Sequence, residues 1–431
     1  MRNLKIPPKE ILENTYIADF HLHSKYSRAS SKNMEPQTFA KIARLKGIHL
    51  IGTGDFTHPL YFQELQNYLE YDKTSGFYVT KEGIDFPKFV LSAEISLIFS
   101  QNNLSNRRMH LILIAPNFEI VKEINLYLSK LGNLMADGRP TFGITAEKIV
   151  LDLIRISSEI LIIPAHAWTP WYSVFGAFSG FDTLEEAFRE ATPYIYAIET
   201  GLSSDPEMNW RISKLDNIAL VSNSDAHSPW KIGREATAFF YPLTYENFVN
   251  AIKYKKIAYT IEFYPEEGKY HLDGHRSCKV SLTPKETIAL GYKCPKCGEP
   301  LTIGVLHRIE QLADRPENYL PEKSPYSVHL VPLMEILAEV FEINPNTKTI
   351  EKLYLQYLEK VGTEFDILLK KEEDELAKVL PEKLLLAIKK VRQGKVFAKA
   401  GYDGVYGIIK IFKDIEDVLD HTPKQKSLFA L

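Results

Sequence analysis

The residues best suited to chemistry begin with two histidines that stand one residue apart. His21 and His23 follow Tyr16-Ile17-Ala18, a short apolar run that predicts a strand. Because alternate side chains of a strand point to the same face, the two imidazoles would project together, as two ligands of one metal ion must. A pair of surface histidines has the same spacing, so the choice between the two interpretations depends on the rest of the chain.

Other potential metal ligands stand at the ends of later apolar runs. They are Asp55, Glu94, His110, His166, Asp225 and His227. Each of them alone is equally consistent with a surface acid or a core histidine, but the joint pattern favours one shared site. Imidazoles mixed with carboxylates suit Zn, Mn or Fe, and two ions held close together can bind both the attacking and the leaving oxygen of a phosphate ester. We therefore predict a phosphoester-hydrolysing site with more than one ion.

The elements that must position these ligands follow an alternating pattern. From residue 17 to about 262, short β-rich runs alternate with segments of helical spacing such as Pro36–Lys46 and Ala146–Ser157. This alternation, repeated about seven times, predicts parallel strands covered by helices, and the number of units favours a closed or nearly closed barrel. Since the ends of different strands converge on one face of such a barrel, the predicted ligands would share one mouth.

The composition narrows the class of protein. The chain has 431 residues, too many for one small core, and its 45% hydrophobic and 25% charged residues are typical of a soluble globular protein. No apolar run is long enough to cross a membrane and the N-terminus lacks a signal-peptide core, so no membrane partner is expected. With three cysteines, we expect a reducing, cytoplasmic location rather than a disulfide framework. The net charge of −3 gives no electrostatic sign of a nucleic-acid partner.

The sequence pattern changes twice along the chain. We predict a metallohydrolase barrel over residues 1–262, a zinc-binding module over 263–310 and a mostly helical C-terminal domain over 311–431. The middle segment is rich in Gly, Pro and Cys, whereas the last segment has apolar residues at three- and four-residue steps with Lys and Glu between them. The C-terminal helices could bind DNA, a sliding clamp or the barrel itself.

Three cysteines and one histidine predict a structural zinc site in the middle segment. Cys294 and Cys297 form a Cys-x-x-Cys knuckle, and His275 stands at the same spacing before Cys278. Two such knuckles around one tetrahedral Zn would stabilise a module too small to have a core of its own. A redox Cys-x-x-Cys pair is the alternative interpretation. The alternative fourth ligands are His271 and His307.

An aromatic loop directly follows His166. Aromatic rings at that place could stack on a base lifted out of a duplex, or they could pack the loop onto the barrel. Two consecutive arginines near His110 are either phosphate-binding donors or an exposed, solvated pair. The candidate DNA- and base-binding residues are Trp168, Trp171, Tyr172, Ser173, Arg107 and Arg108.

Taken in order, the predicted ligands resemble the motifs of the polymerase-and-histidinol-phosphatase (PHP) superfamily. The resemblance covers roughly residues 17–260, and Asp225-x-His227 is its most specific late motif. It implies a distorted (β/α)7 barrel that hydrolyses phosphoesters with two or three divalent ions (Zn, Mg or Mn). The chain departs from the family where Phe56 replaces a common histidine and where Ala29, which cannot coordinate a metal, replaces another common ligand. The predicted catalytic residues are Asp225, His227 and Glu94.

A second resemblance extends over nearly the whole chain. The barrel, the aromatic loop, the His275-x2-Cys278-x15-Cys294-x2-Cys297 pattern, Leu312-Ala313-Asp314-Arg315 and the Gly401–Gly407 turn together resemble the endonuclease Q family. This resemblance implies a metal-dependent DNA repair endonuclease. Such enzymes nick the phosphodiester 5′ to a deaminated base (uracil, hypoxanthine or xanthine) or an abasic site. The expected partner is double- or single-stranded DNA that contains a lesion, with the damaged nucleotide flipped into a pocket.

Two other functions compete with this interpretation. One is a PHP-type phosphatase that acts on a small phosphate monoester, which the near-neutral net charge favours. The other is a non-catalytic nucleic-acid-binding protein with a relict barrel, against which the complete ligand set argues. A zinc module and a helical C-terminal region are more than a small substrate needs, so they favour the endonuclease.

Overall fold

A computed structural model describes residues 6–83, 86–101 and 104–412 of the chain. Its main sheet has 11 strands and runs in the order β15-β12-β11-β1-β2-β5-β4-β3, with β6 pairing with β5 and β8, and β7 pairing with β5. The strands that surround the site are β1 (Thr15–Asp19), β2 (Leu50–Gly52), β5 (Lys88–Gln101), β6 (Leu104–Ala115), β8 (Leu161–Pro164), β11 (Ala236–Phe240), β12 (Ile257–Glu262) and β15 (Tyr326–His329). Shorter strands are β3 (Leu69–Asp72), β4 (Phe77–Thr80) and β7 (Thr141–Phe142).

A separate pair of strands, β9 (Ala197–Glu199) and β10 (Ala219–Val221), lies between β8 and β11. Just past β8, the N–H of Ala167 donates to the carbonyl oxygen of Glu199, 2.9 Å away. Just past β10, the N–H of Ser222 donates to Oγ1 of Thr237 on β11 (2.8 Å), and that hydroxyl donates back to the Ser222 carbonyl oxygen (2.9 Å). Hydrogen bonds therefore link β1, β2, β5, β6, β8, β9, β10 and β11 in one circuit.

Each strand of the circuit divides its side chains between two apolar clusters. Residues of alternate parity, such as Leu50, Val90 and Ile112, belong to one cluster, and their neighbours, such as Ile51 and Phe89, belong to the other. A period of two is what an inner and an outer face of a barrel require. The inner cluster also includes side chains of α8 (Tyr245–Lys253), which therefore packs against it.

The prediction of parallel strands throughout is wrong. The pairs β1–β2, β2–β5, β9–β10 and β12–β15 are parallel, but β1–β11, β11–β12, β5–β6 and β6–β8 are antiparallel. Between β5 and β6 the chain has two residues, 102–103, far fewer than the dozen or so that a parallel crossover needs. The expected mixed α/β fold with a mostly helical C-terminal region is confirmed.

Helices cover the outer face of the circuit. They are α2 (Pro36–Lys46), α3 (Pro59–Tyr68), α4 (Phe118–Leu128), α5 (Ala146–Ile156) and α6 (Leu184–Phe188), preceded by the short α1 (Lys9–Glu13). The spacing of apolar residues predicts α2 and α5 well because their buried faces repeat every three to four residues. No helix in the described ranges is long and apolar enough to cross a bilayer.

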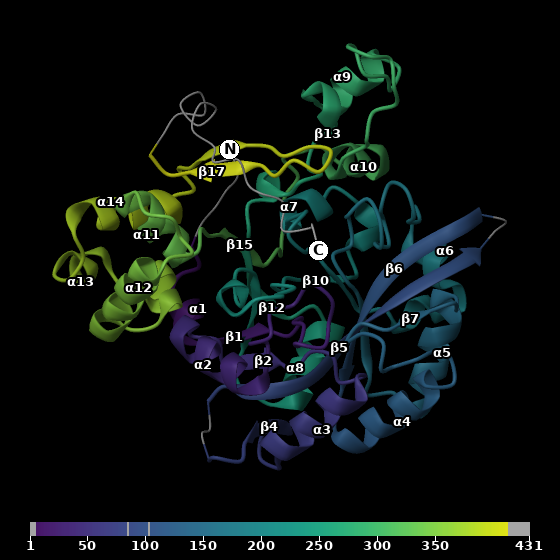
Figure 1. Ribbon diagram of the computed structural model, residues 1–431, viewed down its shortest axis with the longest axis horizontal. Coiled ribbons are helices and arrows are strands. Elements are labelled where there is room, and N and C mark those ends of the chain that lie inside the picture. The colour runs from purple at the N-terminus through teal and green to yellow at the C-terminus, as the bar shows by residue number, and fades with distance from the viewer. Residues whose placement is uncertain (1–5, 84–85, 102–103, 413–431) are drawn as a thin grey trace.

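The C-terminal helices pack against the barrel on the side of α2 (Figure 1). They are α11 (Leu333–Phe341), α12 (Lys348–Val361), α13 (Glu373–Ala377) and α14 (Glu382–Arg392). The Lys46 ammonium at the end of α2 lies 2.9 Å from the Glu364 carboxylate, and both side chains are almost completely buried. Of the three partners that the sequence left open for this region, the structure shows the barrel. A sliding clamp stays a prediction, and residues 413–431 lie outside the described part of the chain.

The middle segment forms a small module above the barrel (Figure 1). Its elements are β13 (Asp273–His275), β14 (Val280–Leu282), α9 (Pro284–Ala289) and α10 (Val305–Leu312). Two later strands, β16 (Phe397–Lys399) and β17 (Ile408–Lys410), form an antiparallel ribbon. The segment between them contacts the module, because the Leu272 N–H donates to the Gly401 carbonyl oxygen. The boundaries at 262 and 310 stay predictions, and β15 of the third segment joins the barrel sheet.

We predict that Glu364→Ala destabilises the whole protein, because it leaves the buried Lys46 ammonium without its partner. Glu364 also accepts hydrogen bonds from the Leu333 N–H (3.0 Å) and the Tyr354 hydroxyl (2.7 Å). Breaking a buried ion pair on one side costs about 3–5 kcal/mol. Thermal or urea unfolding of the variant measures this cost.

The matched control is Glu342→Ala. Its exposed carboxylate lies 3.7 Å from Lys383, and a surface pair contributes about 0–1 kcal/mol. Equal destabilisation by the two substitutions would contradict the assigned role of the buried pair.

Candidate metal centre

The inner face of the circuit carries the predicted ligands directly beyond its apolar layer. On β5, Glu94 lies an even number of residues from Val90, and on β6, His110 lies two residues from Ile112. Alternate residues of a strand point to the same side, so both polar side chains lie on the inner face with Val90 and Ile112. Neither residue ends its strand, contrary to the expectation that Glu94 would close one run and His110 would open another. Because β6 is antiparallel to β5, its imidazole nevertheless lies beside the Glu94 carboxylate.

Glu94 is the centre of the site. Its Oε1 lies 2.9 Å from His110 Nδ1, 3.2 Å from His166 Nε2 and 3.6 Å from His21 Nε2. Its Oε2 lies 3.2 Å from His23 Nε2. The carboxylate is completely buried, and four imidazoles from three different parts of the chain converge on it.

Asp225 approaches the same imidazoles from the loop after β10. Its Oδ1 lies 3.1 Å from His23 Nε2, 3.7 Å from His21 Nε2 and 3.6 Å from His227 Nδ1. His23 is therefore shared between the two carboxylates.

The donor atoms form three overlapping groups. In each group they lie within 4.8 Å of one another. The groups are His21–His23–Glu94, His23–Asp225–His227 and Glu94–His110–His166. The groups share His23 and Glu94, so together they offer donor atoms for more than one ion.

Three buried atoms fit this interpretation independently. Nε2 of His21, Nε2 of His23 and Oδ1 of Asp225 have no hydrogen-bond partner among the described residues, although they point at one another. A buried polar atom without a partner costs free energy, so such a convergence favours a bound cation. Imidazole and carboxylate donors in this mixture suit Zn, Mn or Fe.

Two carboxylates hold the far sides of these imidazoles. Asp55 lies 3.1 Å from His23 Nδ1 and also accepts from the Ser24 N–H and the Ser27 hydroxyl. Asp55, predicted to be a ligand, is thus placed behind His23 and outside the three groups. Glu199 does the same for His21, with Oε1 2.9 Å from Nδ1. Such partners fix the tautomer and orientation of a metal-ligating histidine.

Sequence reasoning missed Glu199 and Arg139. The apolar run Ile195–Ile198 ends in Glu199, the same signal that identified the other carboxylates, so this residue could have been found. Arg139 stands in a loop without a pattern, yet its guanidinium lies 2.9 Å from Glu94 Oε2.

The charges of the site act on one another strongly. Burial by itself would raise the pKa of Glu94, but His110, Arg139 and His21 outweigh it and hold that pKa well below its usual range. Burial would lower the pKa of His21, but Glu199 and Glu94 outweigh it and raise that pKa well above the usual range. Burial keeps the pKa of His110 at about 4 in spite of Glu94. The carboxylates therefore favour positive charge inside the cluster, which divalent ions would supply.

The backbone is unusual at the same residues. Asp55 (φ 43°), His166 (φ 30°) and Asp225 (φ 46°) all have positive φ. Non-glycine residues seldom adopt this conformation, and examples cluster at functional sites. Each of the three residues directly follows or closely follows a strand, so the turn aims its side chain back into the site.

The aromatic loop divides into buried and exposed parts. Trp168 is completely buried and donates Nε1–H to Asn209 Oδ1 (2.8 Å), and Ser173 is buried with its hydroxyl donating to the His166 carbonyl oxygen (2.6 Å). Trp168 and Ser173 therefore pack the loop onto the barrel, which was the alternative to a role in base binding. Tyr172 lies with its ring 4.9 Å from that of His110, at the edge of the metal centre.

An exposed platform lies beside this edge. Trp171 is 38% exposed and stacks on Phe178 at 4.8 Å between ring centroids, and the edge of Tyr270 meets Trp171 at 5.4 Å. We call Trp171, Phe178 and Tyr270 the aromatic platform. The two arginines differ in role, since Arg107 donates to the Gly180 carbonyl oxygen and lies over Phe181, whereas Arg108 lies over the ring of Tyr172 at 5.5 Å.

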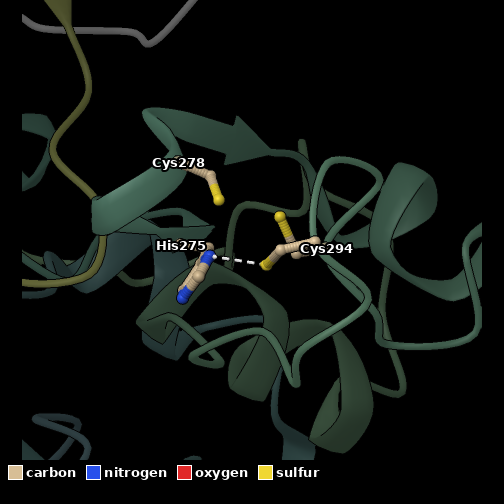
Figure 2. Close-up of side chains that lie close together, drawn as sticks. His275, Cys278 and Cys294 are labelled. Atoms are coloured by element: carbon tan, nitrogen blue, oxygen red, sulfur yellow. Dashed lines mark hydrogen bonds between the residues drawn. The ribbon is translucent and has the colours of Figure 1, made fainter.

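The predicted zinc ligands come together in the module. The donor atoms of His275, Cys278, Cys294 and Cys297 lie within 4.8 Å of one another, and His275 Nδ1 lies 3.4 Å from Cys297 Sγ (Figure 2). His307, an alternative ligand, is buried elsewhere with Nδ1 2.5 Å from Asp273 Oδ2. The grouping of three thiols and one imidazole is suited to a closed tetrahedral Zn site.

Two family models match parts of the chain. One, described as PHP-associated, matches residues 207–257, and the other, described as the MJ0043 C-terminal domain, matches residues 332–395. The uncharacterized protein MJ0043 of Methanocaldococcus jannaschii is 31% identical over 252 residues, 57% of this chain. The chain spans 31% of the length of that relative.

Two solved structures match nearly the whole chain. The lesion-specific endonuclease PfuEndoQ from Pyrococcus furiosus has a TM-score of 0.81 and 33% identity, and the match covers 95% of this chain and 99% of that chain. A structure of endonuclease Q with a 27-mer duplex substrate, which carries an abasic lesion at the active site, has a TM-score of 0.80 and 33% identity. That match covers 94% of this chain and 100% of the other.

We predict that Cys294→Ser removes one equivalent of tightly bound Zn and leaves the ions of the barrel in place. Cys294 is buried with its sulfur within 4.8 Å of the other three donor atoms, and a hydroxyl is a poor replacement for a thiolate. Metal analysis of the purified protein measures the stoichiometry. An unchanged zinc content would contradict the assigned site.

Proposed function

The chain belongs to the endonuclease Q family, and we propose that it nicks a DNA strand on the 5′ side of a deaminated base or an abasic site. It is a DNA repair endonuclease with divalent-metal ligands in a PHP-type barrel. The observation that carries the proposal is the match to a duplex-bound endonuclease Q over 94% of the chain. A phosphatase for a small monoester would not account for a likeness that includes the zinc module and the C-terminal helices.

The barrel cluster supplies the chemistry of hydrolysis. His21, His23, Glu94 and Asp225 would hold the central ions, and His110, His166 and His227 would complete the three groups. Divalent ions at such a centre lower the pKa of a bound water and neutralise the charge on a phosphodiester. The chain's own part is to hold the imidazoles in one orientation, which Asp55 and Glu199 do from behind.

Arg139 and Arg108 add positive charge near the scissile group. Arg139 bonds to Glu94, so it balances one carboxylate of an otherwise acid-rich centre. Arg108 lies over Tyr172, whose ring is next to His110, and its guanidinium can donate to a phosphate at the rim. Among the predicted DNA contacts, these positions support Tyr172 and Arg108.

The aromatic platform suits an unstacked base. Its rings present a flat apolar face beside the metal centre, and stacking of a base on an aromatic side chain does not depend on sequence. Lys269 lies over the rings of Tyr270 and Tyr406 at 5.6 and 5.8 Å, so a cation accompanies the aromatic surface. We propose that the platform supports the strand next to the lesion while the damaged nucleotide is turned out of the duplex. A deaminated base carries a carbonyl in place of an amino group, so a hydrogen-bond donor would select it.

We predict that Asp225→Asn abolishes nicking of a duplex that contains one deoxyuridine but leaves its binding within a few-fold of wild type. The substitution removes the charge that joins His21, His23 and His227 while it keeps the size of the side chain. Nicking with Mg²⁺ or Mn²⁺ is read on denaturing gels and binding by gel shift. Asp152→Asn is the matched control, because Asp152 lies on α5 away from the donor groups and contacts Lys148 and Arg155 of the same helix and the Tyr127 hydroxyl. Full residual cleavage by Asp225→Asn would rule out the assigned centre, and hydrolysis of a generic phosphatase substrate in place of DNA would rule out the proposed function.

We predict that Trp171→Ala weakens binding of lesion-containing DNA, whereas Trp171→Phe restores most of the affinity. Base–aromatic stacking contributes about 1–3 kcal/mol, which corresponds to about 5- to 150-fold in the dissociation constant. Fluorescence anisotropy with labelled duplexes measures the change. Tyr254→Ala is the control, because Tyr254 is a 68% exposed ring beyond the end of α8. Equal affinities of wild type and Trp171→Ala would contradict the role of the platform.

A further inference from the structure

A third set of metal-type donors lies outside both the barrel cluster and the cysteine module. The donor atoms of Asp205, Glu207 and His329 lie within 4.8 Å of one another. Asp205 and His329 are buried and Glu207 is half-buried. One imidazole with two carboxylates is a set that divalent transition metals prefer.

The elements that carry these side chains hold them in place. Asp205 precedes α7 (Pro206–Asn209), and its Oδ1 accepts from the Met208 N–H (2.8 Å) while its Oδ2 lies 3.2 Å from His329 Nε2. Glu207 Oε2 accepts from the hydroxyl of Ser327 (3.2 Å), which stands two residues before His329 on β15. The loop after β9 and the strand β15 therefore meet at this cluster.

A buried carboxylate beside the cluster gives a second, independent observation. Glu262 stands opposite His329 in the parallel β12–β15 ladder, so the two side chains project from the same face of the sheet. Its Oε2 accepts from the hydroxyls of Thr200 and Ser222, but its Oε1 has no hydrogen-bond partner among the described residues. A completely buried carboxylate oxygen without a donor favours a positive charge nearby.

The cluster is accessible from outside. Two members of the cluster, Asp205 and Glu207, line a pocket of about 680 Å³ together with Glu266 and Glu317. Arg211 also lines it, but its guanidinium is paired with Glu310. Acidic walls raise the local concentration of cations, so the pocket provides the entry path that a metal site needs.

We propose that Asp205, Glu207 and His329 bind one divalent transition-metal ion at the inner end of this pocket, with the Glu262 carboxylate beside it. The ion joins the loop that follows Glu199 to the strand that leads into α11. It thus connects Glu199, which holds His21 of the barrel cluster, to the C-terminal helices. The ion takes no part in hydrolysis.

The test counts metal ions in the full-length protein. Wild type, Glu207→Gln, His329→Gln and Glu317→Gln are equilibrated with the same excess of Zn²⁺, passed through gel filtration and analysed for zinc per chain. Glu317→Gln is the matched control, because this acid lines the same pocket but does not belong to the cluster. Circular dichroism establishes which variants are folded, and if His329→Gln is not folded, the half-buried Glu207→Gln decides.

We expect Glu207→Gln and His329→Gln to bind one Zn²⁺ fewer than wild type and Glu317→Gln to bind the full number. Three results would overturn the proposal. A folded Glu207→Gln protein could keep the wild-type stoichiometry, the control could lose the same ion, or the cluster variants could lose more than one ion, which would mean that the substitutions act on the barrel.

Discussion

The convergence of four imidazoles on the buried carboxylate of Glu94 is the constraint on which the rest of the structure depends. These imidazoles come from β6 and from loops after β1 and β8, so the strands of the circuit must end or pass at the same height to bring them together. The apolar layer below them, and α8 beneath that layer, fix this height. The cost of gathering so much polar surface away from water is offset when cations bind, which links the stability of the barrel mouth to its ions.

A second level of order surrounds the ligands. Asp55 and Glu199 hold the outer nitrogens of His23 and His21, and Glu199 also accepts from the His166 N–H (2.7 Å). The buried hydroxyl of Ser173 then binds the carbonyl oxygen of His166. The aromatic loop is therefore tied to His166 through Ser173, and it exposes Trp171 between the buried Trp168 and Ser173. These two buried neighbours fix the position of Trp171 relative to the centre.

Most of the side chains predicted as metal ligands meet at the barrel mouth, and Asp55 lies behind His23, outside the three groups. Their positions were predictable because each one follows or interrupts an apolar run, and strand ends must meet in a barrel. Their role as ligands stays a prediction. The same signal at Glu199 went unused. Strand direction could not be predicted from periodicity, since parallel and antiparallel strands have the same alternation of side chains. Glu94 and His110 lie within long antiparallel strands rather than at strand ends. The exposure of the aromatic side chains could not be predicted either. Trp168 and Trp171 are the same residue type in the same loop, yet Trp168 is buried and Trp171 is exposed. Arg139 depends on tertiary contacts alone.

Anomalous X-ray diffraction from crystals grown with Mn²⁺ shows directly whether the imidazoles and carboxylates around Glu94 bind metal ions. We expect at least two anomalous peaks in the barrel, one of them bounded by His23 and Glu94 and another by His23 and Asp225 or by Glu94 and His166. A map with no peak among these residues, in crystals that hold manganese elsewhere, would contradict this expectation.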